Sequence, residues 1–386
     1  MQFYWIWKEV ILIITENTMQ SKKKVLFYLW SFSLGGGAEK ILATISNNLD
    51  MEKYEIDILE MEHFDKCFPL LRKDINVLKP YKAKKHSRLV EALLWRFRFW
   101  FPGLVRRYLV RDIYDIEISF TIMNPPMPFS KRKGVKKIAW IHGSIENMPE
   151  NEKYCKLHKR HLGSADTIVA ISEKTRRSIE TVFPDYKDKI VTIYNGYNFN
   201  DIRQLGEEKV DIQIKEQSIC SIGRIEKLKG TDRTLELIKK LHEEGHFYHM
   251  YYIGSGEQEN ELKEKVKSYN LNDYVHFLGY QANPYKYLKH MKVLVTMSLQ
   301  EGFSGTCVEA LSLGVPFVST DVGGAKELSQ DGKMGKIVKT DEEAISAIIQ
   351  YVSTDNRPDY QEMSKFIEKF TIENQINQIH DLLIRE

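Results

Sequence analysis

The hydrophobic positions of this chain form short apolar runs that alternate with longer segments of helical periodicity. The runs predict strands at Val25–Trp30, Tyr54–Leu59, Ile116–Phe120, Lys137–Trp140, Thr167–Ile171, Ile190–Ile193, Ser218–Ile222, His249–Ile253, Val275–Leu278, Val293–Thr296 and Pro316–Thr320. Between them, Glu39–Leu49 and Arg233–Glu244 place apolar residues three or four positions apart, as amphipathic helices do. Strands that alternate with helices predict parallel sheets covered by helices on both faces.

The predicted strands are too many for one six-stranded sheet, and 386 residues are long for one hydrophobic core. We therefore expect an α/β protein with two doubly wound, Rossmann-like domains. The polar stretch Asn195–Gln217 is predicted as the boundary. This gives an N-terminal domain over 19–200, a C-terminal domain over 201–360, and C-terminal helices over 361–386 that pack back on the N-terminal domain.

The first residues are apolar from Phe3 to Ile14 but are interrupted by Lys8 and Glu9. This run is too short to span a bilayer and lacks the features of a signal peptide. Residues 1–18 are interpreted as a non-native extension that precedes Met19. An N-terminal helix that touches a membrane is the alternative.

Composition narrows the class of protein. With 42% apolar and 28% charged residues, the chain is typical of soluble globular proteins, and an excess of three basic residues gives no argument for nucleic acid. The cysteines are widely spaced, without a C-x-x-C pair, at Cys67, Cys155, Cys220 and Cys307. This spacing indicates neither a zinc site nor a disulfide framework and fits a reducing cytoplasm.

The segment 82–111 departs from this average, because it holds nine basic residues against one acid, Glu91. Large apolar residues lie among them: Leu93, Leu94, Trp95, Phe97, Phe99, Trp100 and Phe101. A helix of this composition, broken near Pro102-Gly103, suits the headgroup region of an anionic membrane. An ordinary surface helix and an RNA-binding segment are the alternatives.

Two features of the N-terminal half favour ligand binding. The loop 34–39 has three glycines between a predicted strand and a helix, so its backbone at Gly36 and Gly37 can approach an anion closely. It lacks G-x-G-x-x-G spacing, and we identify no ribose-binding acid at the end of the next strand. His142 follows the strand Lys137–Trp140 and is expected to point into the ligand crevice of the sheet. A tight turn and a structural histidine remain the alternatives.

In the C-terminal half, the loop 222–230 presents Arg224 and Lys229 after a predicted strand. A planar guanidinium and a point charge together suit a diphosphate, and Gly223 allows close approach. A solvated charged loop is the alternative. A second glycine-rich loop begins at Gly254 after the next strand.

The most specific motif is 301–309, in which Glu301 follows a predicted strand and Glu309 lies inside a predicted helix. The residues Gly302–Gly305 are expected to supply free backbone N–H groups at the helix start.

These motifs resemble those of the retaining GT-B glycosyltransferases of family 4, the glycosyl transferases group 1. The resemblance covers about Leu34 to Ile337 and is strongest from Ser218 onward. Its elements occur in the expected order: Gly-Gly-x-Glu, Gly-Arg-x4-Lys-Gly, Glu-x7-Glu, and the stretch 321–327. It implies a GT-B fold whose two Rossmann-like domains face a central cleft, and an enzyme of bacterial polysaccharide or capsule type.

The resemblance also implies roles for matching residues. Glu309 would hold the donor ribose and Glu301 the sugar ring, while Arg224 and Lys229 would neutralise the departing diphosphate in place of a metal. The implied catalytic residues are His142, Arg224, Lys229 and Glu301, and the implied donor-binding residues are Gly36, Gly37, Gly223, Gly254, Phe303, Ser304, Gly305, Thr306 and Glu309.

The expected reaction is retaining transfer from a nucleotide-sugar, expected to be a UDP-sugar, to a glycan or polyprenyl-linked oligosaccharide. No Asp-x-Asp occurs in the chain, which agrees with transfer that needs no metal or other cofactor. Ser304 stands where many members of the family have proline, which leaves the sugar open. The expected location is cytoplasmic, at the inner face of the cell membrane, without a nucleic-acid partner.

Three alternatives share parts of this pattern. A nucleotide-sugar 2-epimerase of GT-B fold would need no acceptor. A Rossmann dehydrogenase would need the ribose-binding acid that we do not identify, and a non-catalytic partner protein would lack the charged site residues.

Overall fold

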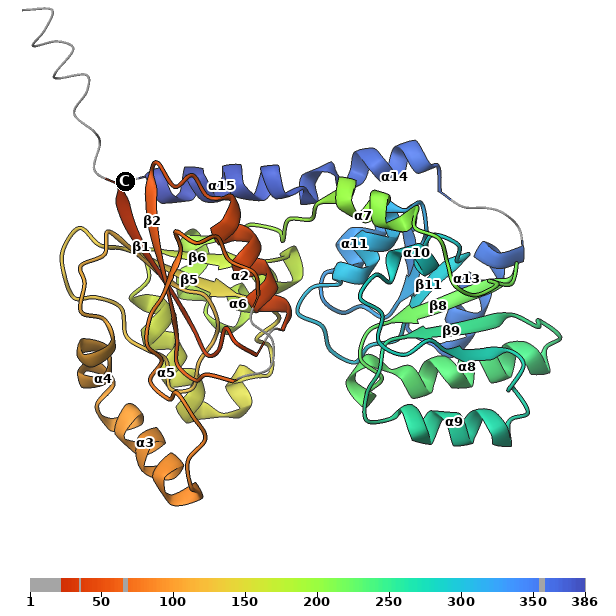
Figure 1. Ribbon diagram of the computed structural model, residues 1–386, viewed down its shortest axis with the longest axis horizontal. Coiled ribbons are helices and arrows are strands. Elements are labelled where there is room, and N and C mark those ends of the chain that lie inside the picture. The colour runs from red at the N-terminus through yellow and green to blue at the C-terminus, as the bar shows by residue number, and fades with distance from the viewer. Residues whose placement is uncertain (1–21, 35, 65–68, 354–357, 386) are drawn as a thin grey trace, which may run out of the picture. The chain divides into compact units, whose positions relative to one another are not determined.

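The computed structural model describes residues 22–34, 36–64, 69–353 and 358–385 (Figure 1). The predictions for residues 1–18 and for Cys67 lie outside the described residues. The chain divides into two compact units, 1–138 and 139–386, with the division inside a strand. The units contribute to two parallel α/β sheets, so the predicted fold class of two parallel-sheet domains is confirmed.

The first sheet has seven strands in the order β3-β2-β1-β4-β5-β6-β7. Their bounds are β1 Lys23–Leu29, β2 Tyr54–Glu60, β3 Asn76–Val77, β4 Ile116–Ser119, β5 Lys136–Ile141, β6 Thr167–Ala170 and β7 Ile190–Thr192. Val25 of β1 is in register with Ile56 of β2 and with Ile116 of β4, both in parallel. The side chains from Val25 to Leu29 are fully buried, as in a strand covered on both faces.

The second sheet has six strands in the order β10-β9-β8-β11-β12-β13. Their bounds are β8 Ser218–Ile222, β9 His249–Ile253, β10 Val275–Phe277, β11 Val293–Thr296, β12 Phe317–Ser319 and β13 Gly335–Ile337. The order reverses between β8 and β11, which pair in parallel. In open α/β sheets, ligands bind beyond the carboxyl ends of the strands at such a reversal.

Helices connect the strands. In the first part of the chain they are α2 Gly37–Asn48, α3 Arg88–Trp100, α4 Pro102–Leu109, α5 Glu152–Gly163, α6 Glu173–Val182 and α7 Phe199–Gly206. The rest are α8 Thr231–Glu243, α9 Glu259–Ser268, α10 Tyr285–Leu288, α11 Gly305–Ser312, α12 Ala325–Ser329, α13 Asp341–Ser353, α14 Tyr360–Ile367 and α15 Ile372–Ile384. Short 3₁₀ helices are η1 Met148–Glu150, η2 Pro184–Lys189, η3 Lys227–Lys229 and η4 Glu368–Phe370.

The core of the second sheet lies on both of its faces. Val293 and Val295 of β11 pack with α8, α9 and α13, whereas Leu294 between them packs with α7, α10, α11 and α14. Figure 1 shows α8 and α9 on one side of this sheet and α10 and α11 on the other. The alternation follows from the two-residue period of a strand, and it explains why β11 is apolar at every position except its last.

All eleven predicted strands are present among the described residues, and their ends lie within two residues of the predicted ones. The strands β3 and β13 were not predicted, because two or three residues are too few to show a period. The segment 195–217, predicted as a polar boundary, contains α7. That prediction missed a helix because its buried contacts come from only two apolar side chains, Phe199 and Ile202.

The basic segment forms two helices, as predicted, because Phe101 ends α3 and Pro102 begins α4. Proline is tolerated at the first position of a helix, where its missing N–H has no partner to lose. The two predicted C-terminal helices are α14 and α15. Within the described residues, no helix combines the length and apolar character needed to cross a membrane.

The position of Gly230, which follows η3, accepts only glycine, because of its backbone angle and of a close neighbouring carbonyl. Its φ is +62°, and a Cβ there would lie 2.0 Å from the carbonyl oxygen of Met297. Gly245 has a φ of +88° with no atom near its Cβ position.

We expect Gly245→Ala to cost about 1–2 kcal/mol of unfolding free energy from backbone strain alone. Gly230→Ala adds a backbone clash and is expected to cost roughly 3 kcal/mol or more. Urea unfolding of both variants checks this, and equal losses would contradict the clash.

Candidate active site

Loops after β8 and β9 meet by direct backbone contact at the reversal of the second sheet. The N–H of Gly223 donates to the Ile253 carbonyl at 3.0 Å, and the N–H of Gly254 donates to the Gly279 carbonyl at 2.8 Å. A Cβ on Gly254, whose φ is +147°, would lie 1.9 Å from the Gly223 oxygen. Only glycine allows this approach, so the two predicted glycines bring their loops together.

Lys229 and Glu301 form the central ion pair of the site. The Nζ of Lys229, at the end of η3, lies 2.7 Å from both carboxylate oxygens of Glu301, which follows β11. The Ser298 hydroxyl donates to the same carboxylate at 2.8 Å. The side chains are 28% and 16% exposed, so the pair is open enough for a ligand to reach. A diphosphate that binds Lys229 would compete with Glu301 for this ammonium.

Arg224 lies on the same loop as Lys229 but is far more exposed, at 74% of its side chain. Its guanidinium lies 3.0 Å from the Glu226 carboxylate. An ion pair this exposed contributes little to stability. Arg224 can therefore turn toward an anionic ligand without a large penalty.

Glu309 lies inside α11, as predicted. The Tyr285 hydroxyl on α10 donates to its Oε1 at 3.2 Å. Burial, followed by the charge of Glu309, raises the pKa of Tyr285, so Tyr285 stays protonated and remains a donor at neutral pH. Sequence reasoning missed Tyr285, since a tyrosine in a short aromatic helix carries no motif.

The start of α11 differs from the expectation that Gly302–Gly305 offer free N–H groups. The Ser304 N–H donates to the Gly323 carbonyl at 2.8 Å, and the Gly305 N–H donates to the Phe303 carbonyl at 2.9 Å. The prediction was wrong for these two groups, because the loop 321–324 supplies the acceptor for Ser304 and the turn itself supplies the acceptor for Gly305. Gly323, with a φ of +49°, approaches so closely that a Cβ there would lie 2.5 Å from the Glu301 Cβ.

His142 lies directly after the carboxyl end of β5, as predicted. A Cβ on Gly302 would lie 2.3 Å from the His142 carbonyl oxygen, and one on Gly143 would lie 3.2 Å from the Gly302 Cα. The histidine loop and the Glu301 loop therefore touch through their backbones. The structure brings His142, Lys229 and Glu301 together through these contacts, and Glu309 lies in the helix that follows the Glu301 loop.

Gly36 and Gly37 belong to the other unit, where Gly36 precedes α2 and Gly37 begins it. The Glu39 carboxylate folds back over this turn, so that a Cβ on Gly36 would lie 2.6 Å from Oε2. Burial raises the pKa of Glu39, against the lowering effect of backbone N–H donors at Glu39 and Gly36. The glycine turn is thus already covered by a carboxyl group of the same chain, that of Glu39. A role toward donor or acceptor stays a prediction.

The second strand of this unit ends in an acid, because β2 runs to Glu60. Its Oε2 accepts from the N–H groups of Phe32 and Ser33 at 2.8 and 2.9 Å and from the Ser33 hydroxyl at 2.8 Å. Glu60 is 1% exposed. It fixes the loop after β1 and is not placed to bind a ribose from solvent.

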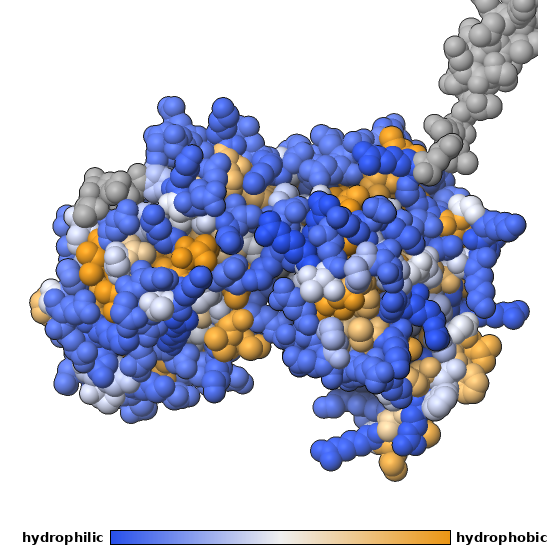
Figure 2. Space-filling view, turned by 180° about the vertical axis from the view of Figure 1, so that it is seen from behind, coloured by the Kyte–Doolittle hydropathy of each residue, from blue (hydrophilic) through white to orange (hydrophobic). Residues whose placement is uncertain are grey.

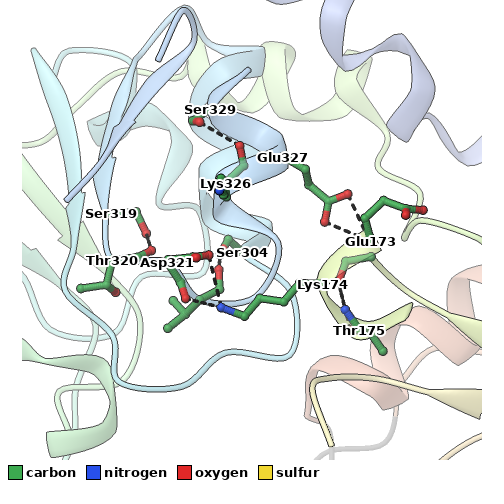
Figure 3. A network of polar contacts seen from close by, with 12 residues as sticks. Glu173, Lys174, Thr175, Ser304, Ser319, Thr320, Asp321, Lys326, Glu327 and Ser329 are labelled. Atoms are coloured by element: carbon green, nitrogen blue, oxygen red, sulfur yellow. Dashed lines mark hydrogen bonds and ion pairs between the residues drawn. The ribbon is translucent and has the colours of Figure 1, made fainter. Parts of the chain in front are cut away.

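Glu327, in the stretch 321–327, lies in α12 and joins a polar network with the first residues of α6 (Figure 3). Its carboxylate accepts from the Glu173 N–H at 3.1 and 3.2 Å and from the Tyr194 hydroxyl at 2.7 Å. Nearby, Lys174 pairs with Asp321 at 3.2 Å. A carboxylate at the first turn of α6 is favoured by the N–H groups exposed there. Glu327 therefore acts as a structural contact beside the site.

Among the described residues, no group of three or more His, Cys, Asp or Glu side chains is arranged to hold a metal ion. The expectation of metal-independent chemistry stays a prediction. Lys229 and Arg224 supply the cationic groups that the site presents.

Comparison with known proteins places these residues in a family. Residues 203–370 match the family described as glycosyl transferases group 1, and residues 35–201 match glycosyltransferase family 4. The two matches adjoin and contain every predicted site residue. The chain therefore belongs to the GT-B glycosyltransferases of the family 4 type, as the sequence motifs indicated.

Individual relatives agree with this assignment. The chain is 30% identical over 255 residues to an uncharacterized glycosyltransferase of Methanocaldococcus jannaschii, covering 64% of this chain and 61% of that protein. It is 27% identical over 334 residues, 82% of this chain and 86% of the relative, to N-acetylgalactosamine-N,N'-diacetylbacillosaminyl-diphospho-undecaprenol 4-alpha-N-acetylgalactosaminyltransferase of Campylobacter jejuni. The structure of Anabaena Alr3699/HepE in complex with UDP superposes with a TM-score of 0.67 at 16% identity, covering 94% and 99% of the two chains. At this low identity, the similarity to the Anabaena structure supports the assignment of the fold alone.

Tyr194→Phe removes one donor from the half-buried Glu327 carboxylate. We expect a loss of about 1–3 kcal/mol of unfolding free energy at neutral pH, because a hydrogen bond to a charged, half-buried carboxylate is lost. Burial already raises the pKa of Glu327, and loss of the donor raises it further. The stability linked to this carboxyl is therefore present at acidic pH and falls as pH rises through its pKa in the folded protein, so the loss should grow with pH.

Urea unfolding at several pH values measures this effect. Tyr186→Phe is the control, because its hydroxyl donates to the exposed Lys159 carbonyl at 2.7 Å. A Tyr194→Phe loss that equals the control loss, or that does not change with pH, would contradict the role given to Glu327.

Proposed function

We propose that this glycosyltransferase is a retaining, metal-independent enzyme that transfers a sugar from a UDP-sugar to a lipid-linked oligosaccharide in cell-surface polysaccharide synthesis. The observation that carries the proposal is the Lys229–Glu301 pair at the reversal of the second sheet. Without a ligand, the Lys229 ammonium is held by the Glu301 carboxylate. This arrangement supports a donor diphosphate site in which a phosphate of the ligand replaces that carboxylate at Lys229. The UDP complex of the Anabaena neighbour supports the choice of nucleotide.

The charges suggest how the residues divide the reaction. Lys229 and Arg224 would stabilise the negative charge that develops on the diphosphate as the glycosidic bond breaks. Once Lys229 engages phosphate, Glu301 is released toward the sugar ring. Glu309, held by Tyr285, would bind the ribose hydroxyls. The leaving phosphate would accept the acceptor proton, so no protein nucleophile is required.

The acceptor is inferred from a relative. The name of the Campylobacter relative describes an acceptor carried on diphospho-undecaprenol. Its match covers 82% of this chain, including both halves. We propose an acceptor of the same class, used on the cytoplasmic side of the membrane. Free thiols at Cys155, Cys220 and Cys307 support a reducing compartment.

Donor binding can be tested by thermal shift with UDP-, GDP- and ADP-sugars. A ligand that binds the folded state raises the unfolding temperature with its occupancy and affinity. We expect a UDP-sugar to do so, and Arg224→Ala, Lys229→Ala and Glu309→Ala each to abolish the shift while the ligand-free protein still unfolds cooperatively. Lys263→Ala is the control, because its ion pair with Glu259 lies on the exposed surface of α9. Full donor affinity in all three site variants would overturn the proposed site.

The reaction itself is tested with a UDP-sugar and a polyprenyl-diphosphate-linked acceptor. We expect the product to keep the anomeric configuration of the donor, as read by NMR. Turnover should be unchanged by EDTA, because Lys229 and Arg224 carry the charge stabilisation. An inverted product or loss of turnover with chelator would contradict the mechanism. Release of an epimerised sugar without any acceptor would instead identify a 2-epimerase.

A further inference from the structure

Helix α3 presents most of its large apolar side chains to solvent and buries an arginine. Arg98 is the one residue of α3 in the buried class, with 5% exposure. The exposed large apolar residues of α3 are Leu89, Val90, Leu93, Trp95, Phe97 and Trp100. An ordinary surface helix has the reverse arrangement, with apolar residues on the core side.

The exposed residues form a stripe. Leu89, Leu93, Phe97 and Trp100 follow one another at spacings of four, four and three, which places them on one face of the helix. Their exposures are 80%, 63%, 45% and 71%. Leu104 and Tyr108 extend exposed apolar surface onto α4, at 56% and 68%. Figure 2 shows this apolar surface among polar atoms at the end of the molecule that α3 occupies.

Polar contacts of arginines fix the opposite side of the segment. The Arg98 guanidinium donates to the Asn124 carbonyl at 2.5 Å and lies 5.0 Å from the centre of the Trp30 ring. Arg106 of α4 donates to the buried Glu117 carboxylate at 2.6 Å. These contacts specify which side of each helix faces the protein. The outward stripe is therefore a built feature and not the result of a loosely attached helix.

Basic residues surround the stripe. Of the nine in 82–111, Arg98 is buried, Lys82 pairs with Glu62 and Glu91, and Arg106 pairs with Glu117. The other six are exposed: Lys84, Lys85, Arg88, Arg96, Arg107 and Arg111. The one acid of the segment, Glu91, is occupied by Lys82 at 2.9 Å. The exposed surface is thus apolar in its middle and cationic around it.

We propose that the outward face of α3 and α4 docks on an anionic lipid bilayer. Leucine, phenylalanine and tryptophan on one helical face can enter the boundary between headgroups and acyl chains, while exposed lysine and arginine contact anionic headgroups. The positive charge of this surface favours an anionic lipid bilayer over a second copy of this chain, because two such cationic surfaces repel one another. This inference does not depend on the donor or the acceptor of the proposed reaction.

The test is co-sedimentation of the full chain with vesicles, without sugar or nucleotide. We expect binding to vesicles that contain phosphatidylglycerol, and binding about tenfold weaker to phosphatidylcholine alone or at high salt. Leu93→Ser with Trp100→Ser should weaken binding by about tenfold or more, since two apolar side chains no longer enter the bilayer. Both positions are exposed, so an unchanged unfolding temperature is expected and confirms that the variant is folded.

Leu70→Ser is the matched control. Leu70 is 90% exposed and lies in the same unit, outside the segment. This variant should bind vesicles like the wild type. Failure of the wild type to bind anionic vesicles would overturn the proposal, as would equal binding by the Leu93/Trp100 variant. Dimerisation in sedimentation velocity that this variant abolishes, without vesicle binding, would assign the surface to a second copy instead.

Discussion

Close approach of one backbone to another is the constraint on which the site depends. Gly254 lies against Gly223, Gly302 against His142, and Gly323 against Glu301, each at a distance that a Cβ would not allow. These contacts fix the loops that carry the charged side chains, while the side chains themselves stay partly exposed. The site is therefore positioned by its backbone, and its side chains keep the freedom to exchange partners.

The ligand-free site neutralises its own charges. Lys229 contacts both oxygens of Glu301, and Arg224 lies beside Glu226. The binding free energy that a ligand gains at Lys229 is only the difference between its own interaction with the ammonium and the Glu301 interaction that it displaces. Such a site favours a ligand that satisfies the cations and the carboxylates together over one that brings phosphate alone. A nucleotide-sugar, with a diphosphate and sugar hydroxyls, has that chemistry.

The sequence predicted the strands and the site loops well, because buried parallel strands give continuous apolar runs and glycine turns follow them. It failed where a structure rests on few residues or on distant partners. The helix α7 depends on two apolar side chains within polar sequence, and β13 has three residues. Glu60 was overlooked although it directly follows the predicted strand. Tyr285 has no local signal, because its partner Glu309 lies 24 residues away. Glu327 lies in the recognised stretch 321–327, but its contact with Tyr194, 133 residues away, was not predicted.

In helix α3, the residues that attach the helix to the protein are not the residues that make it hydrophobic. In most helices the same apolar residues do both, so the attachment and the hydrophobicity of the helix cannot change separately. Here Arg98 attaches the helix through a carbonyl and an aromatic ring, and Leu93 and Trp100 contribute little to the fold. The outward positions can therefore diverge between related enzymes at little cost in stability. Adaptation of this surface to a different environment needs no compensating change in the core.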